Sequence, residues 1–196
     1  MRRLIVTLAV VPVLLFAVAG QALAVLPPGV DKILATANDT CDTTGCTRTI
    51  VNGYKYVDGT AEVIASQARF DLSFVALWQY YGRTPVNPNV FTYDSRGFLV
   101  GIPTTTVNQV ENLLPGNPTL PPRTVTVSAS THKSGKVTTN TYRSTDTDGT
   151  CTYNITQKNQ EAAVVGTLTQ DSLAMDANQQ YRTFITEWTV KQQCPH

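Results

Sequence analysis

Turn-forming dipeptides recur at short intervals along this chain, and they constrain its fold more than any other feature. Segments rich in Thr, Val, Ile and aromatic residues are separated by Asn52-Gly53, by Asp58-Gly59 and by residues 94–97. Asn-Gly and Asp-Gly favour the tight turns of β-hairpins, and segments of this composition favour strands. The pattern therefore predicts a mainly β fold of short antiparallel strands, built as a β-sandwich or a small β-barrel.

The strongest alternation lies between residues 68 and 80. Its even positions carry apolar side chains, among them Phe70, Phe74, Trp78 and Tyr80, whereas most of its odd positions are polar. A period of two predicts one strand with a single buried face. We expect these four aromatic side chains to pack in the core, and the alternative is that they line a cavity for an apolar ligand.

One short helix is predicted over residues 104–114. Thr106 and Gln109 have the spacing of a capping box, and Val107 and Val110 share a helical face with two following leucines. A Pro-Gly pair then ends the segment. The expected fold is therefore mainly antiparallel β with one short helix.

Residues 1–24 have the order of a secretory signal peptide. Two arginines precede an apolar run, and Ala22 and Ala24 form a small-residue cleavage site. An uncleaved anchor is the alternative, but a spanning helix needs about 20 apolar residues and no second apolar run follows. We expect cleavage after Ala24, a single β domain over 25–196 with no transmembrane segment, and a secreted or periplasmic location.

The charge balance argues against a nucleic-acid partner. The whole chain has 15 basic and 14 acidic residues, and removal of Arg2 and Arg3 with the signal peptide leaves 13 and 14. A protein that binds nucleic acid usually carries a clear excess of basic residues. A chain this close to neutral gives no such indication.

Four cysteines in an exported chain predict two disulfides. We expect Cys41 to pair with Cys46, because Gly45 allows a tight reversal between them, and Cys151 to pair with Cys194. The second bridge would close the longer loop and contribute more to stability. A zinc site is the competing interpretation, but its usual close pairs of cysteines occur only once here. No metal or other cofactor is predicted.

Residues 130–136 read Ser-Thr-His-Lys-Ser-Gly-Lys and contain the Ser-x-x-Lys spacing of an activated serine. That dyad needs both side chains on one helical face, whereas Ser130 and Lys133 would point to opposite faces of a strand. Gly135 favours a turn, so we predict the tip of a hairpin. The tip would display His132, Lys133 and Lys136 to an anionic ligand, or would use its lysines to keep strand edges from pairing with other molecules.

No motif in the chain identifies a reaction. Asp146 and Asp148 resemble the start of a calcium loop, but Ile155 stands where the loop needs a glutamate, so an ordinary turn is the better interpretation. We expect an exported non-enzymatic binding or structural module of unknown ligand. Two alternatives remain: a secreted hydrolase that uses a pair of carboxylates, and a carrier of a small apolar ligand.

Overall fold

The computed structural model describes residues 29–111, 120–147, 151–177 and 182–194. These residues form one antiparallel sheet, and the only helix among them is the short 3-10 helix η2, Pro88–Val90. The strands are β1 (Val30–Asp42), β2 (Gly45–Tyr56), β3 (Ala61–Phe70), β4 (Ala76–Pro85), β5 (Thr92–Tyr93), β6 (Leu99–Glu111), β7 (Arg123–Thr147), β8 (Thr152–Gln170), β9 (Leu173–Ala177) and β10 (Arg182–Gln193).

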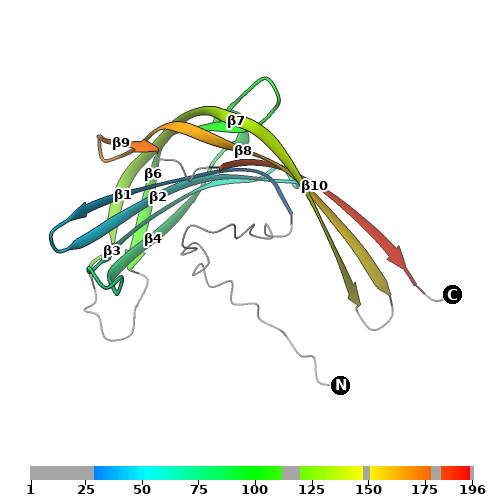
Figure 1. Ribbon diagram of the computed structural model, residues 1–196, viewed down its shortest axis with the longest axis horizontal. Coiled ribbons are helices and arrows are strands. Elements are labelled where there is room, and N and C mark those ends of the chain that lie inside the picture. The colour runs from blue at the N-terminus through cyan, green and yellow to red at the C-terminus, as the bar shows by residue number, and fades with distance from the viewer. Residues whose placement is uncertain (1–28, 112–119, 148–150, 178–181, 195–196) are drawn as a thin grey trace, which may run out of the picture.

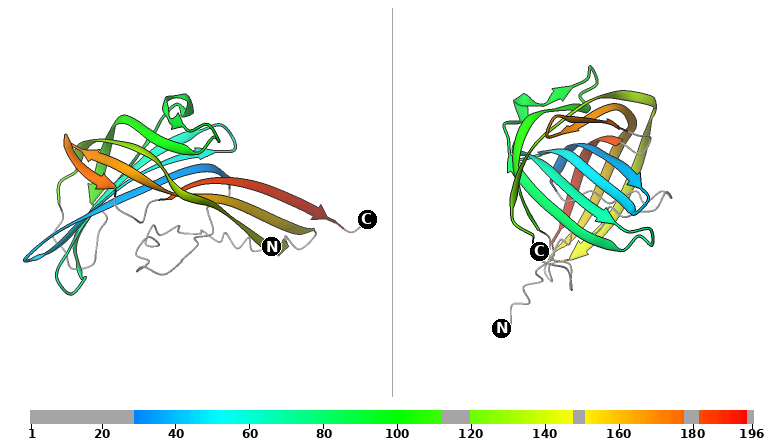
Figure 2. Two further views of the ribbon diagram at one scale, coloured as in Figure 1. Left: turned by 45° about the horizontal axis from the view of Figure 1, so that its top comes forward. Right: turned by 90° about the vertical axis from the view of Figure 1, so that its left-hand side faces the viewer.

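The sheet closes into a ring. Its strand order is β10-β1-β2-β3-β4-β6-β7-β8, and β8 pairs back with β10, so the two ends of that series meet (Figure 1; Figure 2). β5 pairs with β6 and β9 pairs with β8 outside this closed path. The mainly β, antiparallel prediction is confirmed.

Alternate residues of each strand point into the ring and make its core. The interior cluster includes Leu34, Val63, Val107, Val127 and Leu168, which come from five strands and are at most 1 % exposed. This alternation follows from the pleat of a strand, in which successive side chains point to opposite faces. The neighbouring polar residues therefore lie on the outer face.

Two extensions project beyond the ring in opposite directions (Figure 1). At one end the β1–β2 hairpin carries the Cys41–Cys46 disulfide at its tip. At the other, the distal parts of β7, β8 and β10 form a three-stranded extension that the Cys151–Cys194 disulfide closes. Both disulfide predictions are confirmed, although the second bridge lies at the end of the extension and not near the core.

The predicted helix is wrong as far as the structure describes it, because residues 104–111 belong to β6. Val107 is fully buried inside the ring, whereas Val110 is 54 % exposed on the outside. A helix would place these two side chains on one face, so the period of two that the ring imposes overrides the local helical pattern. Residues 112–114 lie outside the described part of the chain.

The predicted aromatic strand is also wrong, because a turn at residues 71–75 divides it into β3 and β4. The amide N–H of Asp71 donates to the carbonyl of Val75 over 3.0 Å, and the N–H of Phe74 donates to the carbonyl of Asp71 over 3.0 Å. Phe74 is 81 % exposed at this turn, whereas Tyr80 is buried. The continuous alternation in the sequence therefore runs across two strands and their connection.

Two turn predictions fail and two are confirmed. Residues 130–136 lie inside the long strand β7, where Gly135 (φ +81°) belongs to a bulge. Gly53 lies inside β2, where an added Cβ would come within 3.1 Å of interior leucine and isoleucine side chains. Asp58-Gly59 does connect β2 to β3, and residues 94–97 do connect β5 to β6.

Candidate functional site

The candidate site is a polar group of side chains inside one end of the ring. We call this end the polar end; β1, β3 and β6 finish there, and β2, β4 and β7 begin there. Strand pairing places Gln109 beside Arg123 and Gln67 beside Tyr80, all facing inward. We call these four residues the Arg123 cluster.

Arg123 is the centre of the cluster. Its Nε donates a hydrogen bond of 2.8 Å to Oε1 of Gln109, and an Nη atom donates one of 2.9 Å to Oε1 of Gln67. Its guanidinium carbon lies 3.9 Å from the centroid of the Tyr80 ring, which is a cation–π contact. The guanidinium is thus held in place by two neutral amides and one aromatic ring.

The charge of Arg123 has no carboxylate partner within ion-pair distance among the described residues. Burial lowers the pKa of Arg123, because desolvation disfavours its charged form, while Tyr80 and Asp171 act in the opposite direction. Asp171 thus acts on Arg123 only from beyond ion-pair distance, whereas buried charges are normally paired directly. The polar end therefore has unmet capacity for a negative group.

Gln109 provides a second unmet group in the same cluster. The side chain is fully buried, and its Nε2 has no hydrogen-bond partner although its Oε1 accepts from Arg123. Buried polar atoms nearly always have a partner in folded proteins. Nε2 of Gln109 is therefore a free donor in the same cluster as the cation of Arg123. Among the described residues, neither group has a carboxylate as a direct partner.

Aromatic side chains flank the cluster. Trp78 lies edge-on to Tyr80 with ring centroids 5.8 Å apart, and the Tyr80 hydroxyl donates to the carbonyl of Pro121 over 3.2 Å. Of the four aromatic residues proposed from the sequence, the structure brings these two together inside the polar end. Phe70 is the last residue of β3, and Phe74 is exposed in the turn that follows.

The three basic residues at 132–136 do not form a free cationic group. Lys133 makes an ion pair of 2.6 Å with Asp94, and its Nζ lies 4.5 Å from the Phe98 ring centroid. His132 is exposed before the bulge, and Lys136 is exposed within it. Ser130 is exposed on the outer face while Lys133 turns to Asp94, so the Ser-x-x-Lys spacing makes no dyad.

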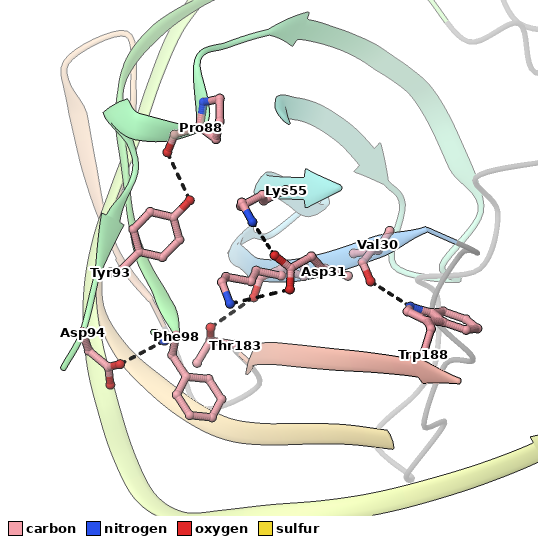
Figure 3. A network of polar contacts seen from close by, with 11 residues as sticks. Val30, Asp31, Lys55, Pro88, Tyr93, Asp94, Phe98, Thr183 and Trp188 are labelled. Atoms are coloured by element: carbon pink, nitrogen blue, oxygen red, sulfur yellow. Dashed lines mark hydrogen bonds and ion pairs between the residues drawn. The ribbon is translucent and has the colours of Figure 1, made fainter. Parts of the chain in front are cut away.

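At the opposite end of the ring, segment 86–98 connects the end of β4 to the start of β6, with Phe91 and Phe98 buried, and we call this the plugged end. Figure 3 draws polar contacts at this end. Asp31 pairs with Lys55 and, over 3.6 Å, with Lys32, while the Tyr93 hydroxyl donates to the carbonyl of Pro88 over 3.1 Å. Burial raises the pKa of Tyr93, and the nearby Asp31 carboxylate adds to this effect. The carboxylate of Asp31 therefore pairs with two lysines.

Asp94 belongs to the same plug. Its Oδ1 accepts from the backbone N–H groups of Arg96 and Phe98, each over 2.9 Å. Burial alone would raise the pKa of Asp94, but Lys133 and these two N–H groups outweigh it and hold that pKa below its usual value. The contacts of Asp94 therefore join the plug to β7.

A hollow of about 290 Å³ lies beside β5, where β6 bulges at residues 103–104. Ser and Thr side chains and backbone line most of it, including Thr92, Thr104, Ser128 and Ser130. No charged or aromatic side chain contributes to its lining. It therefore lacks the anchoring groups that the Arg123 cluster has.

Within the described ranges, no three His, Cys, Asp or Glu side chains lie together as a metal site would require. No helix of these ranges is long and apolar enough to cross a membrane. Asp148, in the segment that resembles the start of a calcium loop, and residues 1–24 of the predicted signal peptide lie outside the described residues.

Comparison with known proteins identifies no relative. No protein family model, no curated protein and no solved structure matches the chain.

Sequence reasoning did not find the Arg123 cluster, because its members come from four strands at scattered positions. One signal was present. Arg123 is followed at every second position by Val125, Val127 and Ala129. If these apolar side chains face the interior of a strand's sheet, Arg123 must face the interior as well. An arginine on the apolar side of an alternating segment is the pattern that would have identified it.

Proposed function

We propose that this protein is an exported, non-enzymatic binding module that holds the anionic group of a small ligand at the Arg123 cluster. The observation that carries this proposal is the partly buried guanidinium of Arg123, which only neutral groups contact among the described residues. A carboxylate, sulfonate or phosphate would supply the missing counter-charge. It would also supply an acceptor for Nε2 of Gln109.

The flanking rings favour a ligand with an apolar part. Trp78 and Tyr80 lie next to the cation, so one face of the site is aromatic and the other is polar. Binding sites commonly combine apolar walls with a few placed polar groups that fix orientation. We therefore expect an acidic amphiphile and not a free inorganic anion.

Export and a barrel architecture belong to the same proposal. Two disulfides suit an oxidising compartment outside the cytoplasm, where a signal peptide would direct the chain. Closure of the strand order through the β8–β10 pair and one interior cluster favour a small barrel over a sandwich, because a sandwich packs two separate sheets.

The test uses two naphthalene dyes as probes: anionic 8-anilinonaphthalene-1-sulfonate and neutral N-phenyl-1-naphthylamine. We expect the anionic dye to bind the purified protein at one equivalent with enhanced fluorescence. Arg123→Gln should weaken this by roughly tenfold or more, since a charged hydrogen bond contributes about 1.5–3 kcal/mol. Arg48→Gln, which removes a surface cation paired with Asp39, is the matched control and should leave the affinity unchanged.

A second variant separates loss of binding from loss of fold. Gln109→Glu places a carboxylate beside Nε of Arg123, where the amide oxygen is now 2.8 Å away. It should exclude the anionic dye while the protein stays folded, because the internal carboxylate takes the place of the ligand. Unchanged anionic dye binding in both variants would refute the proposal.

The two alternative functions appear as different outcomes of these experiments. Tight binding of the neutral dye that does not depend on Arg123 would support a carrier of apolar ligands. Hydrolysis of a glycoside panel that is lost on substitution of two carboxylates would support the hydrolase. In the described residues Asp31 and Asp94 pair with lysines, and Oε2 of Glu111 accepts from the N–H of Leu120, so these three carboxylates have other partners.

A further inference from the structure

The turn between β3 and β4 exposes a group of large apolar side chains. Leu72, Phe74, Val75 and Leu77 are 69 %, 81 %, 57 % and 42 % exposed. We call these four residues the apolar tip. They project from the polar end of the ring, where the β3–β4 connection is at the lower left of Figure 1. Contiguous exposed apolar side chains commonly mark a surface that another partner covers.

The apolar tip is held outward by an ordered turn. Oδ1 of Asp71 accepts from the N–H groups of Ser73 and Val75 over 2.8 and 2.9 Å, and backbone hydrogen bonds close the turn at both ends. These bonds fix the backbone, so the exposed side chains cannot fold back onto the ring without breaking them. The exposure of these four side chains is thus a consequence of the folded turn.

Phe74 adopts a backbone conformation that costs free energy. Its φ is +60°, in the left-handed region that aromatic residues rarely occupy. A glycine would occupy that region without strain and would expose no apolar surface. Phenylalanine at this position is therefore unfavourable for the isolated protein on two separate grounds, and a partner that takes up its ring would offset both.

We propose that the apolar tip inserts into the interfacial region of a lipid bilayer. The tip is a projecting turn and not a groove, so it suits a deformable apolar phase better than a fixed protein pocket. The only charged residue of the turn 71–75, Asp71, directs its carboxylate into the loop, and the nearby Arg69 is already paired with Asp42 over 2.7 Å. The tip thus presents apolar side chains with no uncompensated charge to a membrane surface.

A second exposed leucine supports the same orientation. Leu173 starts β9 beside the turn that follows β8, also at the polar end, and is 65 % exposed. Two separate connections therefore present apolar side chains at the same end of the ring. This inference does not depend on ligand binding at the Arg123 cluster, because the tip lies outside the ring.

The test measures partition of the full mature chain onto vesicles by flotation. We expect wild-type protein to float with neutral phosphatidylcholine vesicles, and an anionic lipid should add little because the tip carries no free cation among the described residues. Phe74→Gly should reduce partition by roughly tenfold, since burial of a phenylalanine contributes about 1.5–3 kcal/mol. The same variant should retain or raise the thermal midpoint, because glycine relieves the strained φ.

Val190→Ser is the matched control, because Val190 is 57 % exposed on the distant three-stranded extension. It should leave partition unchanged. Three results would overturn the proposal: no flotation of the wild type, flotation only with anionic vesicles, or equal partition of wild type and Phe74→Gly. Loss of self-association in Phe74→Gly, without flotation of the wild type, would identify a second copy of the chain as the partner instead.

Discussion

The two ends of the ring differ in how their partly buried charged side chains are paired. At the plugged end, Asp31 and Asp94 each form an ion pair with a lysine, and the other carboxylate oxygen of Asp94 accepts from two backbone N–H groups. Figure 3 shows the pair of Asp31 with Lys55. At the polar end, Arg123 meets only amide oxygens and an aromatic ring among the described residues. Paired charges hold a segment in place, whereas an unpaired charge costs free energy that a bound anion would recover.

The same contrast holds for aromatic side chains. Phe98 at the plugged end is 1 % exposed beneath Lys133, and Phe74 at the polar end is 81 % exposed in a strained conformation. The polar end therefore has both a cation without an ion pair among the described residues and an exposed aromatic residue with a strained backbone. This distribution is expected where one end serves structure and the other serves binding.

The largest expected effect compares these two phenylalanines. Phe98→Ala should lower the free energy of unfolding by about 3 to 5 kcal/mol, because it removes a large ring from the packed plug. Phe74→Ala should change it by less than about 0.5 kcal/mol, as is usual for an exposed side chain. Urea unfolding followed by fluorescence measures both. Similar losses in the two variants would contradict the division between a structural and a binding end.

The disulfides of the two extensions give the next comparison. Replacing Cys151 and Cys194 by serine should lower the free energy of unfolding by about 4 kcal/mol, against about 2 kcal/mol for Cys41 and Cys46, because the chain between the bridged residues is longer. The sequence separations are 43 and 5 residues. Thermal unfolding of the two double variants tests this order. Equal losses would show that loop closure does not dominate their contributions.

The smallest effect is a pH dependence at the plugged end. The pKa of Asp94 is lower in the folded chain than in the unfolded chain, so its ionised form favours folding above about pH 4, and this contribution is lost as the pH falls through the folded pKa. Asp94→Asn should therefore lower the free energy of unfolding at pH 7, by about 1 kcal/mol for a partly exposed pair. The difference from wild type should shrink as the solution is acidified.

Urea titrations at several pH values would show that convergence. A constant difference between Asp94→Asn and wild type from neutral to strongly acidic pH would mean that the Lys133 pair does not act through ionisation of Asp94.

Features that depend on a few neighbouring residues were predictable from the sequence. The Cys41–Cys46 bridge spans a turn at Gly45, and the connection at 94–97 uses Gly97 with a φ of +81°. Backbone conformations of this kind are decided by local sterics, which the residue types report directly. The alternation of apolar and polar residues likewise predicted antiparallel strands, because it reflects burial of one face of a sheet.

Four other features were decided only by the pairing of strands. Residues 104–111 have a helical pattern, but β6 pairs with β7, and this brings Gln109 beside Arg123. Gly135 becomes a bulge because β8 pairs along both sides of it. The closing contact between β8 and β10, and the meeting of Gln67 with Arg123, join positions that no short-range signal relates. Side chains on different strands become neighbours only when those strands pair, so the cation without an ion pair at the polar end is a property of the tertiary structure.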